Sequence, residues 1–177
     1  QRLGDKPVIT KGAFDSQNVA FWDPEIKKYR AYIRDFHDGL RDIRLAFSDD
    51  FITWTTPELL KVVPPVEKEQ FYVNCIARYD RAPHLFLGFP VRYVERPWSP
   101  SMRVLPDLAH RQLRAKAGER IGTAITDGVF MSSRDGVNWD RPFLEAWVRP
   151  GRDQKNWTER NIMPAWGIAE TAPGEWS

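Results

Sequence analysis

The sequence is poor in the residues that build covalent or metal-based sites. It has one cysteine, Cys75, and three histidines in 177 residues. A single thiol excludes an intrachain disulfide framework and a zinc site made of several thiolates. His37, His84 and His110 show no metal-ligand spacing with one another or with Cys75. We therefore expect no metal and no other cofactor, and we expect Cys75 to be a buried thiol in an apolar strand.

Long apolar runs and an excess of one charge are also missing. No run approaches the roughly 18 residues of a membrane span, and 26 basic against 24 acidic residues leave a net charge of +2. The chain has no Gly-rich phosphate loop and no G-x-S-x-G motif. Binding of nucleic acid would depend on one basic segment without a recognisable module. We expect neither nucleic acid nor a membrane as a partner.

Aromatic residues, in contrast, make up 13% of the chain. They fall in short runs that alternate between apolar and polar residues. The runs are separated by turn residues at roughly 10-residue spacing, which is the pattern of an antiparallel meander. The first four predicted strands cover residues 18–22, 29–34, 43–47 and 54–56.

The meander is repeated further along the chain. FDSQNVAFWD at 14–23 matches FYVNCIARYD at 71–80, and a motif S-x-D-x-x-x-W occurs at 48–54 and again at 133–139. The Ser and Asp side chains can accept hydrogen bonds from backbone groups in a turn, and the Trp offers a large apolar face to a neighbouring sheet. Sheets repeated in this way indicate a β-propeller.

We therefore predict an all-β protein, a partial β-propeller over residues 1–177. The blades are expected at 14–60 and at 71–148, and the start of another at 157–177, with a strand at 165–169. Two blades cannot close a ring. The last residues, 173–177, indicate a turn and the beginning of a strand that has no partner. We interpret the chain as a fragment.

The second unit contains an insertion at 91–125. From Val91 to Arg120 it has seven basic and three acidic residues, and a short helix is predicted from Asp107 to Ala117, ending at Gly118. A solvated surface excursion is the favoured interpretation. The alternative is a lid over a site that binds something anionic.

The meander with its S-x-D-x-x-x-W turn, together with FDSQNVAFWDPEIKKYRAYIR, resembles the five-bladed propellers of the glycoside hydrolases that include arabinanases, β-xylosidases, invertases and levansucrases. Sialidase propellers carry their Trp at the eighth position of the Asp-box, whereas Trp54 and Trp139 stand at the seventh. The resemblance implies a carbohydrate as substrate or ligand, hydrolysis of a glycosidic bond, and a secreted or periplasmic protein.

In that family the catalytic carboxylates stand near the start of the innermost strand of successive blades, and hydrolysis needs two of them. The matching residues here are Asp15 and Glu159. The middle unit has Tyr72 at the matching place, and Glu69 is a weaker candidate. As alternatives, Asp15 caps the entry turn beside Ser16 and Glu159 is a solvated loop residue.

Polar residues near the same strand starts are candidates for binding sugar hydroxyls, or alternatively for satisfying backbone groups. They are Gln17, Asn18, Asn74, Arg160 and Asn161. Because the middle unit lacks a well-placed carboxylate, a propeller that binds glycans or proteins without catalysis is the second hypothesis.

Overall fold

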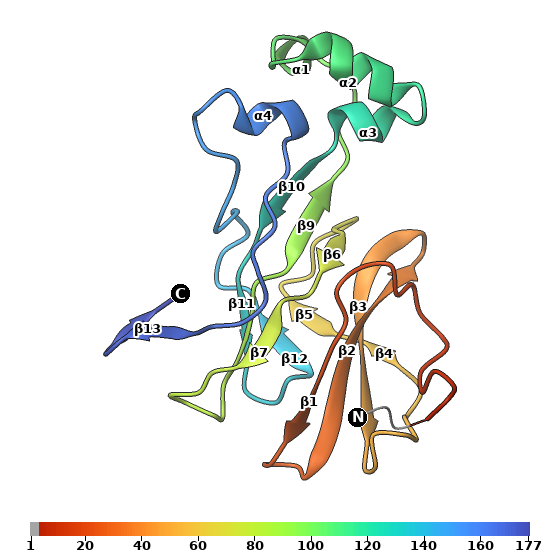
Figure 1. The fold of residues 1–177 in the computed structure, drawn as a ribbon, viewed down its shortest axis with the longest axis vertical. Helices are drawn as coiled ribbons and strands as arrows, with labels where there is room; N and C mark the ends of the chain where they lie inside the picture. The colour runs from red at the N-terminus through yellow and green to blue at the C-terminus, as the bar shows by residue number, and fades with distance from the viewer. Residues whose placement is uncertain (1–3) are drawn as a thin grey trace.

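A computed structural model describes residues 4–177, and strands dominate it (Figure 1). The predicted all-β class is confirmed. The first sheet has four antiparallel strands in sequence order. These are β1 (Val19–Asp23), β2 (Lys28–His37), β3 (Leu40–Ser48) and β4 (Glu58–Leu59). The strand predicted at 54–56 is reduced to a bridge between Ser48 and Trp54.

The second sheet repeats this meander and gains one strand. Its order is β5-β12-β11-β8-β7, and the outermost pair, β5 with β12, is parallel. The strands are β5 (Lys61–Val63), β7 (Ile76–Arg78), β8 (Phe86–Gly88), β11 (Met131–Ser133) and β12 (Asn138–Asp140). β1 and β7 occupy matching places in the two copies of the repeat.

A three-stranded sheet, β10-β9-β6, continues the second sheet toward the helices (Figure 1). Its strands are β6 (Phe71–Val73), β9 (Val91–Val94) and β10 (Ile125–Gly128). Only Phe89 and Pro90 separate β8 from β9. A proline cannot donate to the ladder, so a break in pairing is expected at this point. The β9–β10 hairpin carries the predicted insertion at its tip.

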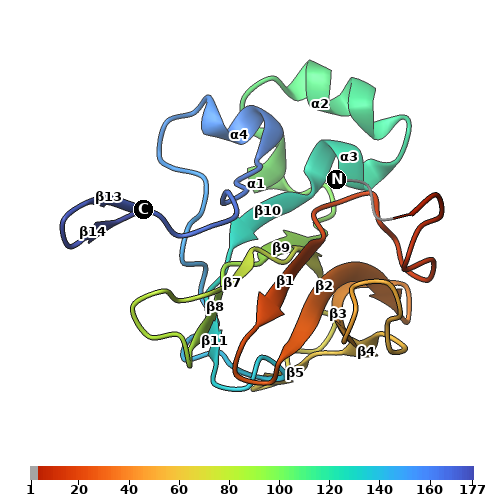
Figure 2. The ribbon, with the colours of Figure 1, turned by 60° about the horizontal axis from the view of Figure 1, so that its bottom comes forward.

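The insertion is organised by three helices, α1 (Pro100–Arg103), α2 (Leu108–Ala115) and α3 (Glu119–Thr123). The predicted helix at 107–117 is confirmed as α2. Arg111 on α2 is 1% exposed, and its guanidinium group donates to the carbonyls of Met102, Leu105 and Pro106 at 2.7–2.9 Å. A buried cation that satisfies three carbonyls holds the α1–α2 connection in one conformation. Figures 1 and 2 show the helices together at one end of the molecule.

The main core lies between the first and second sheets. It is formed by Tyr32, Ile43, Leu45, Phe71, Ile76, Phe86, Val129, Met131 and Trp139. β2 is buried on both faces, because Ala31 and Ile33 face one way while Arg30, Tyr32 and Arg34 face the other. Face-to-face burial of consecutive sheets is the packing that the repeat predicts.

The first S-x-D-x-x-x-W copy forms the predicted turn. The Asp50 carboxylate accepts the backbone N–H groups of Ile52 and Thr53 at 2.8 and 2.7 Å. The Trp54 indole donates to the carbonyl of Phe51 at 3.1 Å. These bonds satisfy backbone groups that no strand pairs.

The second copy repeats the same bonds. Asp135 accepts the N–H groups of Val137 and Asn138 at 2.8 and 2.7 Å, and the Trp139 indole donates to Gly136 at 3.2 Å. Gly136 has φ +70° and lies against the Tyr32 hydroxyl, which donates to its carbonyl at 2.9 Å. The turn of the second sheet therefore also packs on the first.

These turns make the stability of the fold depend on pH. Backbone N–H groups of Thr53 and Ile52 lower the pKa of Asp50 to about 2. Partial burial raises the pKa of Asp135, but hydrogen bonds from Asn138 and Val137 outweigh it and lower the pKa to about 2. Unfolded Asp titrates near 3.9, so this contribution is complete above about pH 4 and is lost as pH falls through 2.

We expect the unfolding free energy to decline between about pH 4 and pH 2, and D50N and D135N each to reduce that slope. Denaturant titrations at several pH values measure this. Asp38, an exposed aspartate in the β2–β3 turn, provides the control D38N. A slope unchanged by both motif variants would contradict the assignment.

The C-terminal segment differs from the prediction. No strand forms at 165–169. Instead α4 (Asn156–Glu159) is followed by a hairpin of β13 (Glu170–Ala172) and β14 (Glu175–Trp176). The terminal strand thus has a partner, contrary to expectation. Pro164 lacks an N–H and Gly167 has φ +113°, which interrupts extended pairing. The Trp166 indole, rather than a backbone group, reaches β7 by donating to Ile76 at 2.8 Å.

Candidate functional site

Two cavities lie beside the β9–β10 hairpin. Arg92 pairs with Asp127 and Tyr93 with Thr126 across the hairpin, and neighbouring residues of a strand point to opposite faces. A cavity of about 600 Å³ has Arg92 and Asp127 in its wall. A cavity of about 180 Å³ has Thr126 in its wall. Tyr93 borders both.

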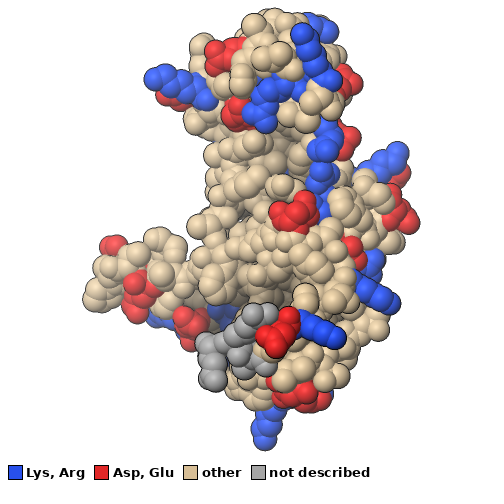
Figure 3. All heavy atoms as spheres, turned by 45° about the vertical axis from the view of Figure 1, so that its right-hand side comes forward, with Lys and Arg blue, Asp and Glu red and all other residues tan. Residues whose placement is uncertain are grey.

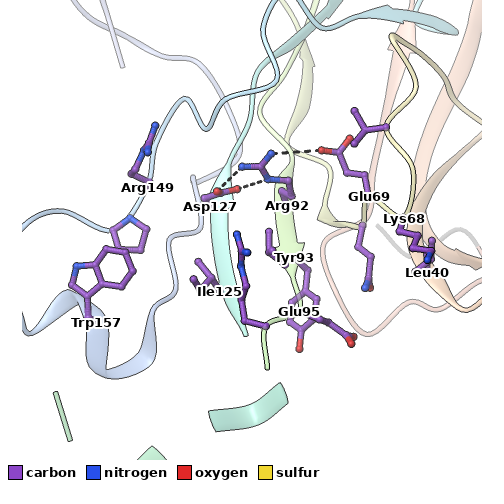
Figure 4. A pocket seen from close by; sticks show the side chains of 15 residues that line it. Leu40, Lys68, Glu69, Arg92, Tyr93, Glu95, Ile125, Asp127, Arg149 and Trp157 are labelled. Atoms are coloured by element: carbon purple, nitrogen blue, oxygen red, sulfur yellow. Dashed lines mark hydrogen bonds and ion pairs between the residues drawn. The ribbon is translucent and has the colours of Figure 1, made fainter. Parts of the chain in front are cut away.

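The larger cavity contains a network of paired charges (Figure 4). Arg92 donates to both oxygens of Asp127 at 2.9 and 2.7 Å, and its Nη1 lies 3.9 Å from Glu69 Oε1. Arg141, which is buried, also contacts Glu69. Burial raises the pKa of Glu69, and the guanidinium groups of Arg141 and Arg92 oppose that rise. Glu69 therefore has two cationic partners in the structure.

The smaller cavity, termed here the mouth cavity, collects polar residues from distant parts of the chain. β3 supplies Arg41, β6 supplies Tyr72, and the β9–β10 hairpin supplies Tyr93 and Thr126. The helical insertion on one side, and the end of α4 with the segment after it on the other, complete the cavity. These two parts contribute Arg114, Arg120, Ile121, Ala124, Glu159, Arg160, Asn161 and Met163.

Glu159 is held by α2. His110 Nε2 lies 3.1 Å from one carboxylate oxygen, and Arg114 donates to the other at 2.5 Å. Partial burial raises the pKa of Glu159, but the His110 and Arg114 contacts outweigh it, so the pKa is lowered. Glu159 is therefore an anion at neutral pH. Its contacts with His110 and Arg114 connect the insertion to the end of α4.

Arg160 and Asn161 follow directly. Arg160 is 2% exposed, and its guanidinium group donates to the carbonyls of Ala124, Ile121 and Thr158. Asn161 Oδ1 accepts from the Thr126 hydroxyl at 3.2 Å. Both residues thus bind the segment to β10 while they form part of the cavity wall.

Asp15 is not one of the lining residues of the mouth cavity, and it is linked to the cavity residue Tyr72 through Arg34. Its side chain is 73% exposed and accepts from Arg34 Nη2 at 2.9 Å. The Arg34 guanidinium carbon is 5.6 Å from the centroid of the Tyr72 ring, and the Ser16 hydroxyl donates to the Tyr72 carbonyl at 2.9 Å. The starts of the two predicted inner strands are therefore in contact, with Arg34 touching both Asp15 and Tyr72.

Three of the four amide side chains predicted to bind sugars make hydrogen bonds to the backbone instead. Asn18 Oδ1 accepts the N–H of Arg34, and Gln17 Oε1 accepts that of Cys75. Asn74 is fully buried and donates to the carbonyls of Gln17 and Tyr32. Their contacts correspond to the alternative interpretation of these residues as satisfiers of backbone groups.

Among the lining residues of the mouth cavity that the sequence did not predict are Arg41, Tyr93 and Arg120. None stands at the start of an innermost strand, so the repeat gives no reason to select them. The only sequence signal was the excess of basic residues between Val91 and Arg120, and it does not include Arg41. Cys75 is buried as predicted, and burial raises its pKa to about 11.

Within residues 4–177, no three His, Cys, Asp or Glu side chains are grouped so that they could hold a metal ion. No helix in the same part of the chain has the length and apolar character needed to cross a bilayer.

No protein-family profile and no curated protein matches the sequence. Among solved structures, an N-acetylgalactosamine deacetylase from F. plautii in complex with blood group B trisaccharide is 14% identical, with a TM-score of 0.55, over 82% of this chain and 34% of that one. A glycoside hydrolase is 15% identical, with a TM-score of 0.50, over 94% of this chain and 44% of that one. At these identities the likeness shows a shared fold. This chain spans less than half of either structure.

Proposed function

We propose that the chain is part of a β-propeller related to glycoside hydrolases and that it binds a carbohydrate at the mouth cavity. The observation that carries the proposal is the gathering of the predicted strand starts. Tyr72, Glu159 and Asn161 share one cavity, and Asp15 is joined to Tyr72 through Arg34. Aromatic rings beside hydrogen-bonding groups are what a site needs to bind a ligand with both apolar and polar parts. The two solved structures of similar fold, one a glycoside hydrolase and one holding a trisaccharide, add support.

In the hydrolytic form of the proposal, Asp15 and Glu159 are the catalytic carboxylates. A proton donor works best with a raised pKa, and a nucleophile or base must be ionised. The lowered pKa of Glu159 fits the ionised role. Asp15, whose side chain is exposed, is then the candidate for the second carboxylate.

A non-catalytic propeller that binds glycans or proteins is the second candidate. The ion pairs favour this candidate, because both Asp15 and Glu159 have arginine partners. In addition, the matching position of the middle unit is Tyr72, which has no carboxylate. Carboxylates used only to orient arginines would have this arrangement.

We expect E159Q and D15N each to lower the hydrolysis of an array of oligosaccharides by about 100-fold or more, while binding is retained. Reducing-sugar release and glycan-array binding measure the two effects. E67Q, at a side chain that is 90% exposed, is the matched control. Binding without hydrolysis by the unaltered protein would support the non-catalytic form, and unchanged turnover in both variants would contradict the assignment of these two carboxylates. No binding to any glycan would contradict the proposed function.

A further inference from the structure

The mouth cavity has a strong imbalance of charge. Four arginines line it, and Glu159 is its one carboxylate. Glu159 is already engaged by Arg114 and His110. Among residues 4–177, Arg41, Arg120 and Arg160 have no ion pair. Arg160 is satisfied by backbone carbonyls, which leaves Arg41 and Arg120 as cations without an ion pair, although the more distant charge of Glu95 also acts on Arg120.

Arg41 is the more constrained of these two cations. Its Nη1 donates to Gln70 Oε1 at 2.6 Å, and its guanidinium carbon lies 4.2 Å from the centroid of the Tyr93 ring. Its Nε is buried and has no hydrogen-bond partner in the structure. Burial lowers the pKa of Arg41, and the positive charges of Arg120 and Arg34 lower it further. A nearby anion would relieve both costs.

Arg120 approaches the same tyrosine from the insertion. Its Nη1 lies 3.3 Å from the Tyr93 hydroxyl, which accepts the hydrogen bond. Arg41 on the ring face and Arg120 at the hydroxyl thus come from the first sheet and from α3 to a single side chain. Figure 3 shows basic side chains over the helical insertion and in a column that runs down from it. Such a cluster in a concave, partly dry site attracts and holds anions.

We propose that the mouth cavity holds the anionic group of an acidic sugar, a uronic carboxylate or a sulfate ester, between Arg41 and Arg120. The planar guanidinium fork matches the oxygens of both groups. At about 180 Å³ the cavity is smaller than the ~300 Å³ of typical ligand pockets, so it admits one charged unit while the rest of the glycan stays outside. This inference rests on the proposed carbohydrate function.

The test uses an array in which each acidic oligosaccharide is paired with its neutral parent, a methyl-esterified uronide or a desulfated glycan. We expect the protein to bind acidic members, and calorimetry on the best pair to show at least tenfold weaker binding of the neutral parent. R41Q and R120Q should each weaken the acidic member about tenfold or more, as loss of a charged hydrogen bond predicts, and should weaken the neutral parent much less. R41K, which keeps the charge without the fork, should have an intermediate affinity.

R134Q removes the same charge at an exposed position of the second turn motif and is the matched control. Circular dichroism verifies that each variant is folded. Equal affinity for acidic and neutral members, or acidic binding unchanged in R41Q and R120Q, overturns this inference and leaves the proposed function standing. Competition by free sulfate as strong as that of the acidic glycan would indicate an inorganic-anion site and overturn it as well. Absence of binding to every glycan overturns the proposed function itself.

Discussion

Replacement of Trp139 by alanine is expected to lower the free energy of unfolding by about 3–5 kcal/mol. Trp139 is fully buried between the two sheets, and its ring meets Tyr32 edge-on with centroids 6.2 Å apart. Its indole also closes the second turn motif on Gly136. Truncation removes an apolar contact between sheets and leaves a cavity that the surrounding strands cannot fill, because interiors are close-packed.

The chain supplies its own control for this prediction. Trp54 stands at the same motif position in the first copy, makes the same indole bond to its turn, and is only half-buried. W54A should therefore cost clearly less than W139A. Denaturant unfolding with both midpoint and slope recorded separates lost stability from a changed unfolded state. Equal costs for the two variants would mean that Trp139 acts only through its turn and not through the core.

Much of the strand pattern could be predicted from the sequence because it depends on local chemistry. The turns at Asp50 and Asp135 were predicted correctly because each carboxylate accepts hydrogen bonds from backbone N–H groups two and three residues away. α2 was predicted from Asp107 near its N-terminus and from Gly118 as its stop. Structures that depend on hydrogen bonds between residues close in sequence are largely kept in the folded protein.

Features that depend on long-range contacts were not predicted. The segment 165–169 has strand-like residues, yet Trp166 bonds to Ile76 through its side chain, 90 residues away in sequence. In the same way, alternation along β2 could not show that Arg34 is buried against Tyr72, because that contact depends on the second sheet. Pairing across distant segments overrides local propensity.

The candidate site likewise contains residues that the sequence predicted and residues that only long-range contacts bring together. The family resemblance led to Asp15 and Glu159. Glu159 lines the mouth cavity together with Tyr72, and Asp15 is joined to Tyr72 through Arg34. The two arginines of the mouth cavity without an ion pair, Arg41 and Arg120, come from β3 and α3, which are fixed there by sheet pairing and by the helical insertion. The insertion contributes cavity residues, as a lid would, and its helices are internally braced by Arg111.

A second large effect is expected at the charged cluster that joins the two sheets. Asp23, at the end of β1, is 1% exposed and accepts from Arg30 Nε at 2.6 Å and from Arg78 Nη1 at 3.0 Å. Arg30 belongs to β2 and Arg78 to β7, so one carboxylate holds cations from both sheets. D23N keeps the shape of the side chain and removes the charge. We expect it to cost about 3–5 kcal/mol, the range for breaking a buried pair by changing one partner.

The cost arises because Asn cannot compensate two guanidinium groups, and its amide N–H groups would meet donors rather than acceptors. Asp49 offers the exposed comparison: it pairs with Lys28 at 2.8 Å while 77% of its side chain is exposed. D49N should cost less than about 1 kcal/mol, and added salt should abolish that small effect. Because the Asp23 cluster is shielded from solvent, its effect should persist at high salt. Similar losses for the two variants, or a D23N effect that disappears with salt, would show that Asp23 does not hold the sheets together.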